Sequence, residues 1–228
     1  MLWILFALLL VGIIFGPSIW VRWVMAAHAD TIAGMPGTGG ELARHLLDRF
    51  EVDGTGVEVS SGGDHYDPSA RMVRLEEKHM HGKSLTAIAI AAHEVGHALQ
   101  HHRGDKSLAA RTKMMPLADK IARLSTGLIW AAPIVGLVTR HPVPFSGLVI
   151  IGLGGLIARM LVHLVTLPTE WDASFGKALP VLVQGQYIAP DEEVIVRKIL
   201  RAAALTYVAA ALADVLNLFR WVALLLRR

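Results

Sequence analysis

Residues 84–102, SLTAIAIAAHEVGHALQHH, form the centre of the predicted structure. Alanine and other strong helix formers fill this stretch, which has no proline and one glycine, Gly96. The side chain of Ser84 can cap the amino end of a helix, so we predict a helix over nearly the whole stretch. Residues four apart lie on one face of a helix, so His93 and His97 are expected to point the same way.

The run His93-Glu94-Val95-Gly96-His97 has the spacing H-E-x-x-H, in which two imidazoles bind one zinc ion. Zinc lowers the pKa of a coordinated water to about 7. Glu94 would then act as general base, taking the proton of that water and returning it to the leaving amine. The pattern therefore predicts one Zn²⁺ per chain and peptide-bond hydrolysis. The alternative is a helix with two packed or exposed histidines and an unrelated glutamate.

A catalytic zinc needs a third protein ligand and an open fourth position. The metzincin pattern would place glycine and histidine where this chain has Gln100 and Arg103, so that class is excluded. Glu170 follows an apolar block and is the best candidate, whereas Glu192 and Glu193 are weaker ones. The alternative for Glu170 is an ordinary acidic residue at the end of a membrane span.

The composition indicates an integral membrane protein. Hydrophobic residues make up 54% of the 228 residues and charged residues 18%, whereas a soluble domain carries about 25% charged residues. Apolar blocks occupy residues 2–21, 124–139, 143–167 and 202–226, and the first is long enough to cross a bilayer. The absence of cysteine excludes thiolate ligands and disulfides, and a net charge of +3 without a basic run gives no sign of nucleic-acid binding.

These blocks predict five segments. They are a transmembrane helix at 1–23, a cytosolic zinc peptidase core at 24–123, a transmembrane helical hairpin at 124–167, a third-ligand helix and loop at 168–201, and a transmembrane helix and tail at 202–228. Pro17 is expected to kink or end the first helix. A cleaved signal peptide is the alternative for the start, but the long apolar run and the lack of an early basic residue disfavour it.

The distribution of basic residues predicts the orientation. Most of those near span ends fall on the side of the 24–123 core, which we therefore expect in the cytoplasm of a multi-pass plasma membrane protein. The terminal Arg227-Arg228 pair conflicts with this assignment. Two membrane passes, or none, separate His97 from Glu170, so both return to the same side.

Within the core, Thr38 and Glu41 have the spacing of a capping box before a helix at 41–50. Residues 57–60 and 71–76 are predicted to pair as a short β-hairpin, with a turn at Asp67-Pro68-Ser69 between them. The fold class is therefore mainly α (α+β). If 71–76 is an edge strand, an extended substrate could add to it.

The runs Asp64-His65-Tyr66-Asp67-Pro68, Val73-Arg74-Leu75, 91–98 and Glu170-Trp171-Asp172-Ala173-Ser174 together resemble the bacterial YugP-type membrane neutral zinc metallopeptidases. The resemblance covers most of the chain, including the order of apolar blocks. It implies a gluzincin-like core.

In that family pattern, His93 and His97 would be zinc ligands, Glu94 the base and Glu170 the third ligand. The similar HtpX-type peptidases tend to have aspartate four residues after the ligand glutamate, where this chain has Ser174. Whether Asp172 supports a ligand histidine is therefore left open, although an orienting acceptor is expected.

Several other polar residues have less specific signals. His101 is expected at the helix surface and His65 in a turn. Tyr66 or Tyr187 could stabilise an oxyanion, and nothing in the spacing selects either. Arg159 and His163 lie within an apolar block, and Arg159 can pair with Asp214.

The sequence thus predicts a membrane-embedded zinc metallopeptidase, expected to be an endopeptidase, that acts on a peptide or protein substrate and contacts lipid but not nucleic acid. One alternative is an intramembrane, site-2-type zinc protease, since residues 85–99 are apolar. No later N-P-D-G-like motif supports it. Another is a non-catalytic zinc-binding membrane scaffold, which has no need for Glu94.

Overall fold

The structure is a computed structural model that describes residues 2–212 and 214. It is mainly helical, with one small sheet among the described residues. The chain divides into two compact units. The core unit contains residues 19–109 and 167–206, and the helical unit contains 2–18, 110–166 and the described residues from 207 onward. Most of the predicted final span at 202–228 lies outside the described residues.

The sheet of the core unit has strands β1 (Gly56–Ser60), β2 (His65–Asp67) and β3 (Met72–Glu76) in the order β1-β3-β2. β1 runs parallel to β3, and β2 runs antiparallel to β3. The predicted pairing of 57–60 with 71–76 is confirmed, but the two strands run parallel, so the predicted hairpin between them is wrong. The chain reverses through β2, so β3 returns in the direction of β1.

The hairpin that does form joins β2 to β3. The Asp67 carboxylate accepts the backbone N–H groups of Ser69 at 2.9 Å and Ala70 at 3.1 Å, which fixes the predicted turn. Because β3 is the central strand, the hypothesis of substrate addition at 71–76 is also wrong: both of its edges already carry strands.

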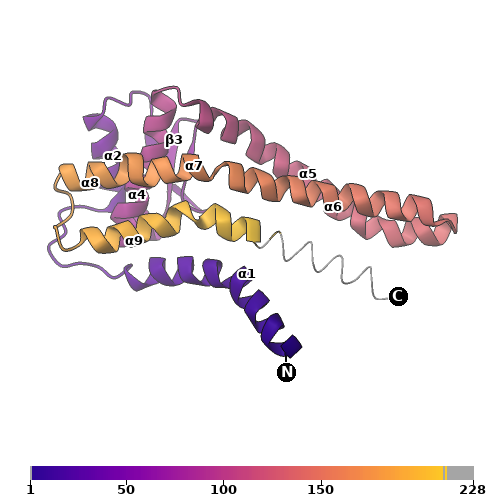
Figure 1. The fold of residues 1–228 in the computed structure, drawn as a ribbon. Coiled ribbons are helices and arrows are strands. Elements are labelled where there is room, and N and C mark those ends of the chain that lie inside the picture. The colour runs from indigo at the N-terminus through magenta and orange to yellow at the C-terminus, as the bar shows by residue number, and fades with distance from the viewer. Residues whose placement is uncertain (1, 213, 215–228) are drawn as a thin grey trace. The chain divides into compact units, whose positions relative to one another are not determined.

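Helix α4 (Leu85–His102) passes through the middle of the core unit (Figure 1). All of its residues from Leu85 to Gln100 are buried. The surrounding elements are α2 (Gly39–Arg49), α3 (Glu77–Met80), the sheet, α7 (Leu167–Trp171), the π-helix η1 (Asp172–Ala178), α8 (Leu179–Gln184) and α9 (Glu193–Ala204). Their apolar side chains form one buried cluster around α4, including Leu46, Val73 and Leu200. This packing makes α4 a rigid support for the residues on it.

The two predicted helix caps are confirmed. Thr38 Oγ1 accepts the N–H of Glu41 at 3.2 Å, and the Glu41 carboxylate accepts the N–H of Thr38 at 2.7 Å. Ser84 Oγ accepts the N–H of Ala87 at 3.1 Å at the start of α4. These side chains satisfy N–H groups that a helix leaves without partners at its first turn.

In the helical unit, α5 (Lys106–Thr139) and α6 (Pro142–Val165) pack as a hairpin (Figure 1). The helices approach so closely that a Cβ added at Gly152 would lie 2.5 Å from Ile129 Cγ1. The apolar block at 124–139 is thus the second half of a 34-residue helix rather than a short element. Helix α1 (Leu2–Ala27) continues through Pro17 and does not end there.

Two helical runs among the described residues, Lys106–Thr139 and Pro142–Gln184, are long and apolar enough to cross a membrane. Many of their large apolar side chains are exposed, including Leu137 at 79% and Ile150 at 69%. The unit also contains Arg159, whose Nε lies 3.3 Å from Asp119 Oδ1 and 3.5 Å from Asp214 Oδ2. This confirms the hypothesised pairing of Arg159 with Asp214.

Candidate metal centre

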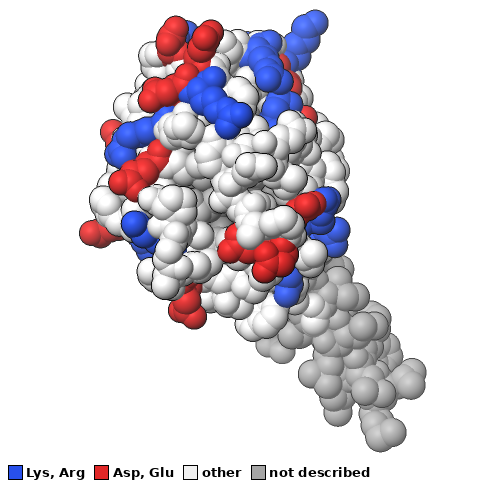
Figure 2. Space-filling model, turned by 90° about the vertical axis from the view of Figure 1, so that its left-hand side faces the viewer, with Lys and Arg blue, Asp and Glu red and all other residues white. Residues whose placement is uncertain are grey.

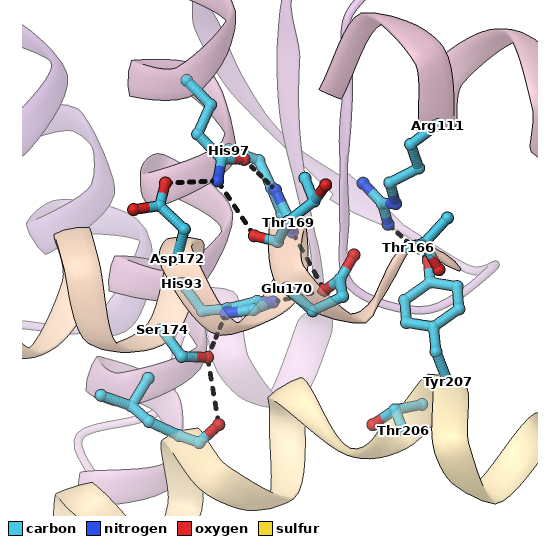
Figure 3. Close-up of polar contacts among 12 residues, drawn as sticks. His93, His97, Arg111, Thr166, Thr169, Glu170, Asp172, Ser174, Thr206 and Tyr207 are labelled. Carbon is cyan, nitrogen blue, oxygen red and sulfur yellow. Dashed lines mark hydrogen bonds and ion pairs between the residues drawn. The ribbon is translucent and has the colours of Figure 1, made fainter. Parts of the chain in front are cut away.

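The core unit brings His93, His97 and Glu170 to one point (Figure 3). Glu170 Oε2 lies 3.3 Å from Nε2 of His93 and 3.3 Å from Nε2 of His97. The three side chains are 6%, 2% and 2% exposed for His93, His97 and Glu170 respectively. The histidines come from α4 and the glutamate from α7, more than 70 residues later in the sequence.

The other glutamates considered from the sequence lie elsewhere. Glu192 accepts the N–H of Ala189 at 2.7 Å, and Glu193 pairs with Arg197 at 2.7 Å on α9. Glu94 follows His93 on α4 and is buried. The predicted third ligand is therefore the acidic residue that the fold places beside the two histidines.

Gly96 allows the close packing that builds the centre. A Cβ at this position would lie 2.7 Å from the carbonyl oxygen of Ala173, closer than real Cβ atoms come to backbone. The backbone of η1 thus lies directly against α4. The π-helix follows α7 without a break and widens the turn just after Glu170, a feature that is frequent at functional sites.

Ser174 fixes the orientation of His93. Its Oγ lies 2.9 Å from Nδ1 of His93 and 3.1 Å from the carbonyl oxygen of Leu200. A carbonyl can only accept, so the single hydroxyl hydrogen is donated to Leu200 and Ser174 accepts the Nδ1–H of His93. In the neutral imidazole of His93 the lone pair is therefore on Nε2, which faces Glu170.

Gln100 holds His97 in the same way. Its Oε1 lies 2.9 Å from Nδ1 of His97, and its Nε2 donates to the carbonyl oxygen of Thr169 at 2.9 Å and to Asp172 Oδ2 at 2.8 Å. The sequence did not single out Gln100 for this role. Its position three residues after His97 on a helix was the available signal, since such residues are neighbours on the helix surface.

Asp172 is ionised in this arrangement. Burial raises the pKa of its carboxyl group, but hydrogen bonds from Gln100 and Lys177 outweigh burial and hold the pKa below its usual value. Lys177 Nζ lies 2.7 Å from Asp172 Oδ2. Asp172 thus contacts Gln100 rather than His93 or His97, and Ser174, the residue four after Glu170, contacts His93.

The donor set fits a zinc ion. Two imidazole nitrogens and one carboxylate oxygen, each with a lone pair directed to the same buried point, would repel one another unless a cation lay between them. Their separations of 3.3 Å exceed the roughly 2.7–2.9 Å of a charge-assisted hydrogen bond. Imidazole and carboxylate together suit Zn²⁺.

A second group of possible metal ligands, Asp64, Glu76 and His79, makes contacts that join two elements of the fold. Asp64 Oδ2 lies 2.7 Å from Nδ1 of His79, and Asp64 Oδ1 accepts the N–H of Glu76 at 2.8 Å. Asp64 therefore joins the end of β3 to α3. Glu76 itself pairs with Lys78.

Four other residues considered from the sequence lie in the core unit and have partners there. His65 begins β2 rather than lying in a turn, and its Nδ1 is 3.0 Å from the carbonyl oxygen of Gly63. Tyr66 Oη lies 2.8 Å from Nδ1 of His101, so His101 is engaged by the sheet. Tyr187 Oη accepts from Arg49 at 2.7 Å, and His45 Nε2 lies 2.7 Å from the same oxygen.

Comparisons with known proteins agree with this chemistry. Residues 3–226 match a family described as "Putative neutral zinc metallopeptidase". The chain is 36% identical over 230 residues to the "Putative membrane protease YugP" of Bacillus subtilis strain 168, covering 99% of this chain and 97% of that protein. No solved structure matches the chain. The chain belongs to the neutral zinc metallopeptidase family that its residues 3–226 match.

Proposed function

We propose that this protein is a membrane-anchored zinc endopeptidase with a gluzincin-like core. His93, His97 and Glu170 hold one Zn²⁺, and Glu94 is the general base. The observation that carries the proposal is the convergence of three buried ligand atoms, with both Nδ1 atoms held by Ser174 and Gln100 on the outer side of the rings.

When bound, zinc supplies Lewis acidity, which polarises a substrate carbonyl and acidifies water. The chain's own residues perform the proton transfers and the positioning. The Glu94 carboxylate accepts a proton from the attacking water and delivers it to the nitrogen of the leaving amine. Ser174 and Gln100 each accept an Nδ1–H, which keeps both ligand rings in the tautomer with a free Nε2 lone pair.

The placement in the membrane is part of the proposal. We assign the protein to the plasma membrane as a multi-pass protein, with α5 and α6 as a spanning hairpin and the core unit in the cytoplasm. The exposed apolar side chains of these helices and the membrane protease name of the Bacillus subtilis relative support it. The substrate is a peptide or protein. On the face of the molecule in Figure 2, Lys and Arg side chains are interspersed with Asp and Glu side chains.

The test of the chemistry pairs zinc content with cleavage. Wild type, Glu94→Gln and Glu170→Ala are purified in detergent, and bound zinc and cleavage of an unfolded protein are measured. Glu193→Gln is the matched control, because that glutamate pairs with Arg197 away from the centre.

Wild type and the control should hold one zinc and cleave, Glu94→Gln should keep zinc without activity, and Glu170→Ala should lose zinc. Full zinc binding by Glu170→Ala would overturn the ligand assignment. Zinc binding by wild type without cleavage of any substrate would favour the non-catalytic scaffold. Equal cleavage activity of Glu94→Gln and wild type would overturn the assignment of Glu94 as general base.

The orientation is tested by single-cysteine labelling, since the chain has no cysteine of its own. Ser61→Cys lies on an exposed loop of the core unit, and His141→Cys lies on the exposed turn between α5 and α6. A membrane-impermeant thiol reagent added to intact cells should label only the second variant. Labelling of Ser61→Cys from outside would reverse the assigned orientation.

A further inference from the structure

We propose that Gln100 is a positioning residue of the metal centre, which fixes the tautomer of His97 and joins it to the helix that carries Glu170. The inference rests on the proposed function only in taking these residues as zinc ligands. Gln100 is 1% exposed and lies three residues after His97 on α4, so no water competes for its amide.

The surroundings of Gln100 leave one orientation of its amide. Its nitrogen faces the carbonyl oxygen of Thr169 at 2.9 Å and a carboxylate oxygen of Asp172 at 2.8 Å. Both are acceptors: a carbonyl oxygen can only accept, and the two carboxylate oxygens of Asp172 receive the ammonium group of Lys177 at 2.9 Å and 2.7 Å. The amide oxygen must therefore face His97, where it accepts the Nδ1–H at 2.9 Å.

The same three contacts tie two parts of the centre together. Thr169 and Asp172 flank Glu170 in the sequence, one on each side. One side chain thus links an imidazole ligand on α4 to the backbone that presents the carboxylate ligand. Lys177 completes this series, since its ammonium group lies 2.7 Å and 2.9 Å from the two carboxylate oxygens of Asp172.

Position 100 requires a group with a donor and an acceptor at the end of a long side chain. Leucine has a similar size, but it would leave the Thr169 carbonyl and Asp172 without a donor and His97 without an acceptor. Glutamate would give His97 an acceptor while placing a second negative charge against Asp172. The double substitution Gln100→Glu with Asp172→Asn moves the amide to position 172, and this restores a hydrogen-bond donor between the side chains at positions 100 and 172.

This charge swap provides the test. Full-length wild type, Gln100→Leu, Gln100→Glu, Asp172→Asn and the double variant Gln100→Glu/Asp172→Asn are purified in detergent and stripped of zinc. Zinc affinity is then measured by competition with a chromophoric chelator, and helix content and thermal unfolding of the zinc-free chains are recorded. Gln184→Leu is the matched control, because it makes the same change at an exposed position on α8.

Gln100→Leu and Gln100→Glu should weaken zinc affinity about 10- to 100-fold. On a logarithmic scale, the double variant should recover at least half of the zinc affinity that Gln100→Glu loses. Gln184→Leu should bind zinc with wild-type affinity. Wild-type zinc affinity in Gln100→Leu would overturn the proposal. If Gln100→Leu does not fold, the double variant Gln100→Glu/Asp172→Asn decides the question. The proposal is overturned if the folded double variant binds zinc no better than folded Gln100→Glu. It is also overturned if the double variant does not fold.

Because the readout is zinc affinity, the result is separate from the proposed activity. A wild-type chain that binds zinc but cleaves nothing would end the endopeptidase assignment and leave the role of Gln100 intact. If the Gln100 variants bind zinc with wild-type affinity and the wild-type chain cleaves its substrate, the role of Gln100 is overturned and the endopeptidase assignment stands.

Discussion

Gly96→Ala is the substitution that most directly tests how the metal centre is built. The new methyl group would lie 2.7 Å from the carbonyl oxygen of Ala173 and 3.3 Å from its Cα and carbonyl carbon. Ordinary van der Waals contact begins at 3.4 Å, so η1 would have to move away from α4 by roughly 0.7 Å. The neighbouring atom is backbone and has no rotamer through which to escape.

Two opposing energies set the effect on stability. Alanine is better than glycine inside a helix by roughly 0.8–1.0 kcal/mol. Overpacking a well-packed interior costs about 1–3 kcal/mol. Overpacking therefore dominates, and the zinc-free protein should lose roughly 0–2 kcal/mol of unfolding free energy.

The effect on the metal should be larger than the effect on stability. A zinc site tolerates changes in ligand distance of about 0.2 Å. The required displacement is several times greater and moves the segment carrying Ser174 and, just before it, Glu170. We expect zinc affinity to fall by at least about 10-fold, with a corresponding loss of cleavage at limiting zinc.

The assay compares chelator competition for zinc with thermal unfolding of the zinc-free chain. Gly127→Ala is the matched control, because a Cβ at that helical glycine meets nothing within 4 Å. It should bind zinc as wild type does. Wild-type zinc affinity in Gly96→Ala, with the chain folded, would refute the reasoning that the contact between α4 and η1 sets the ligand geometry.

Three further predictions follow from the core unit. Thr38→Ala removes the cap of α2 and should lower the unfolding free energy by about 1 kcal/mol, measured by denaturant unfolding, whereas Thr38→Ser should restore most of it. Hydrogen bonds from the backbone N–H of Ala70 and from Arg74 hold the pKa of Asp67 below its ordinary 3.8, so its contribution is present above that pH and is lost as the pH falls through the lowered pKa. Asp67→Asn should thus destabilise the protein at pH 7 and lose this difference in acid, as followed by melting temperature against pH; a difference that persists in acid would contradict the argument. Zinc at 100 times its dissociation constant should raise the unfolding free energy of the zinc-free protein by about 2.7 kcal/mol. Glu170→Ala should abolish this gain. An equal gain in Glu170→Ala would indicate that zinc binds elsewhere.

The sequence by itself determined the local features. The helix over 84–102, its Ser84 cap and the Thr38–Glu41 capping box depend on residues within a few positions of each other, so their pattern predicts them directly. The pair of histidines on one face of α4 follows from the same helical geometry. The order of apolar and polar blocks also indicated the two helices of the hairpin.

Only the tertiary structure decided how distant segments meet. The parallel pairing of β1 with β3 depends on the path of residues 61–71, which carry β2 back along the sheet. The contacts of Ser174 with His93, and of Gln100 with Thr169 and Asp172, exist because Gly96 lets η1 lie against α4. No periodicity encodes such a contact between segments some 70 residues apart, since it depends on how two backbones pack. The motif therefore placed His93 and His97 on one face of a helix, and the packing of α4 against η1 determined which side chains orient them.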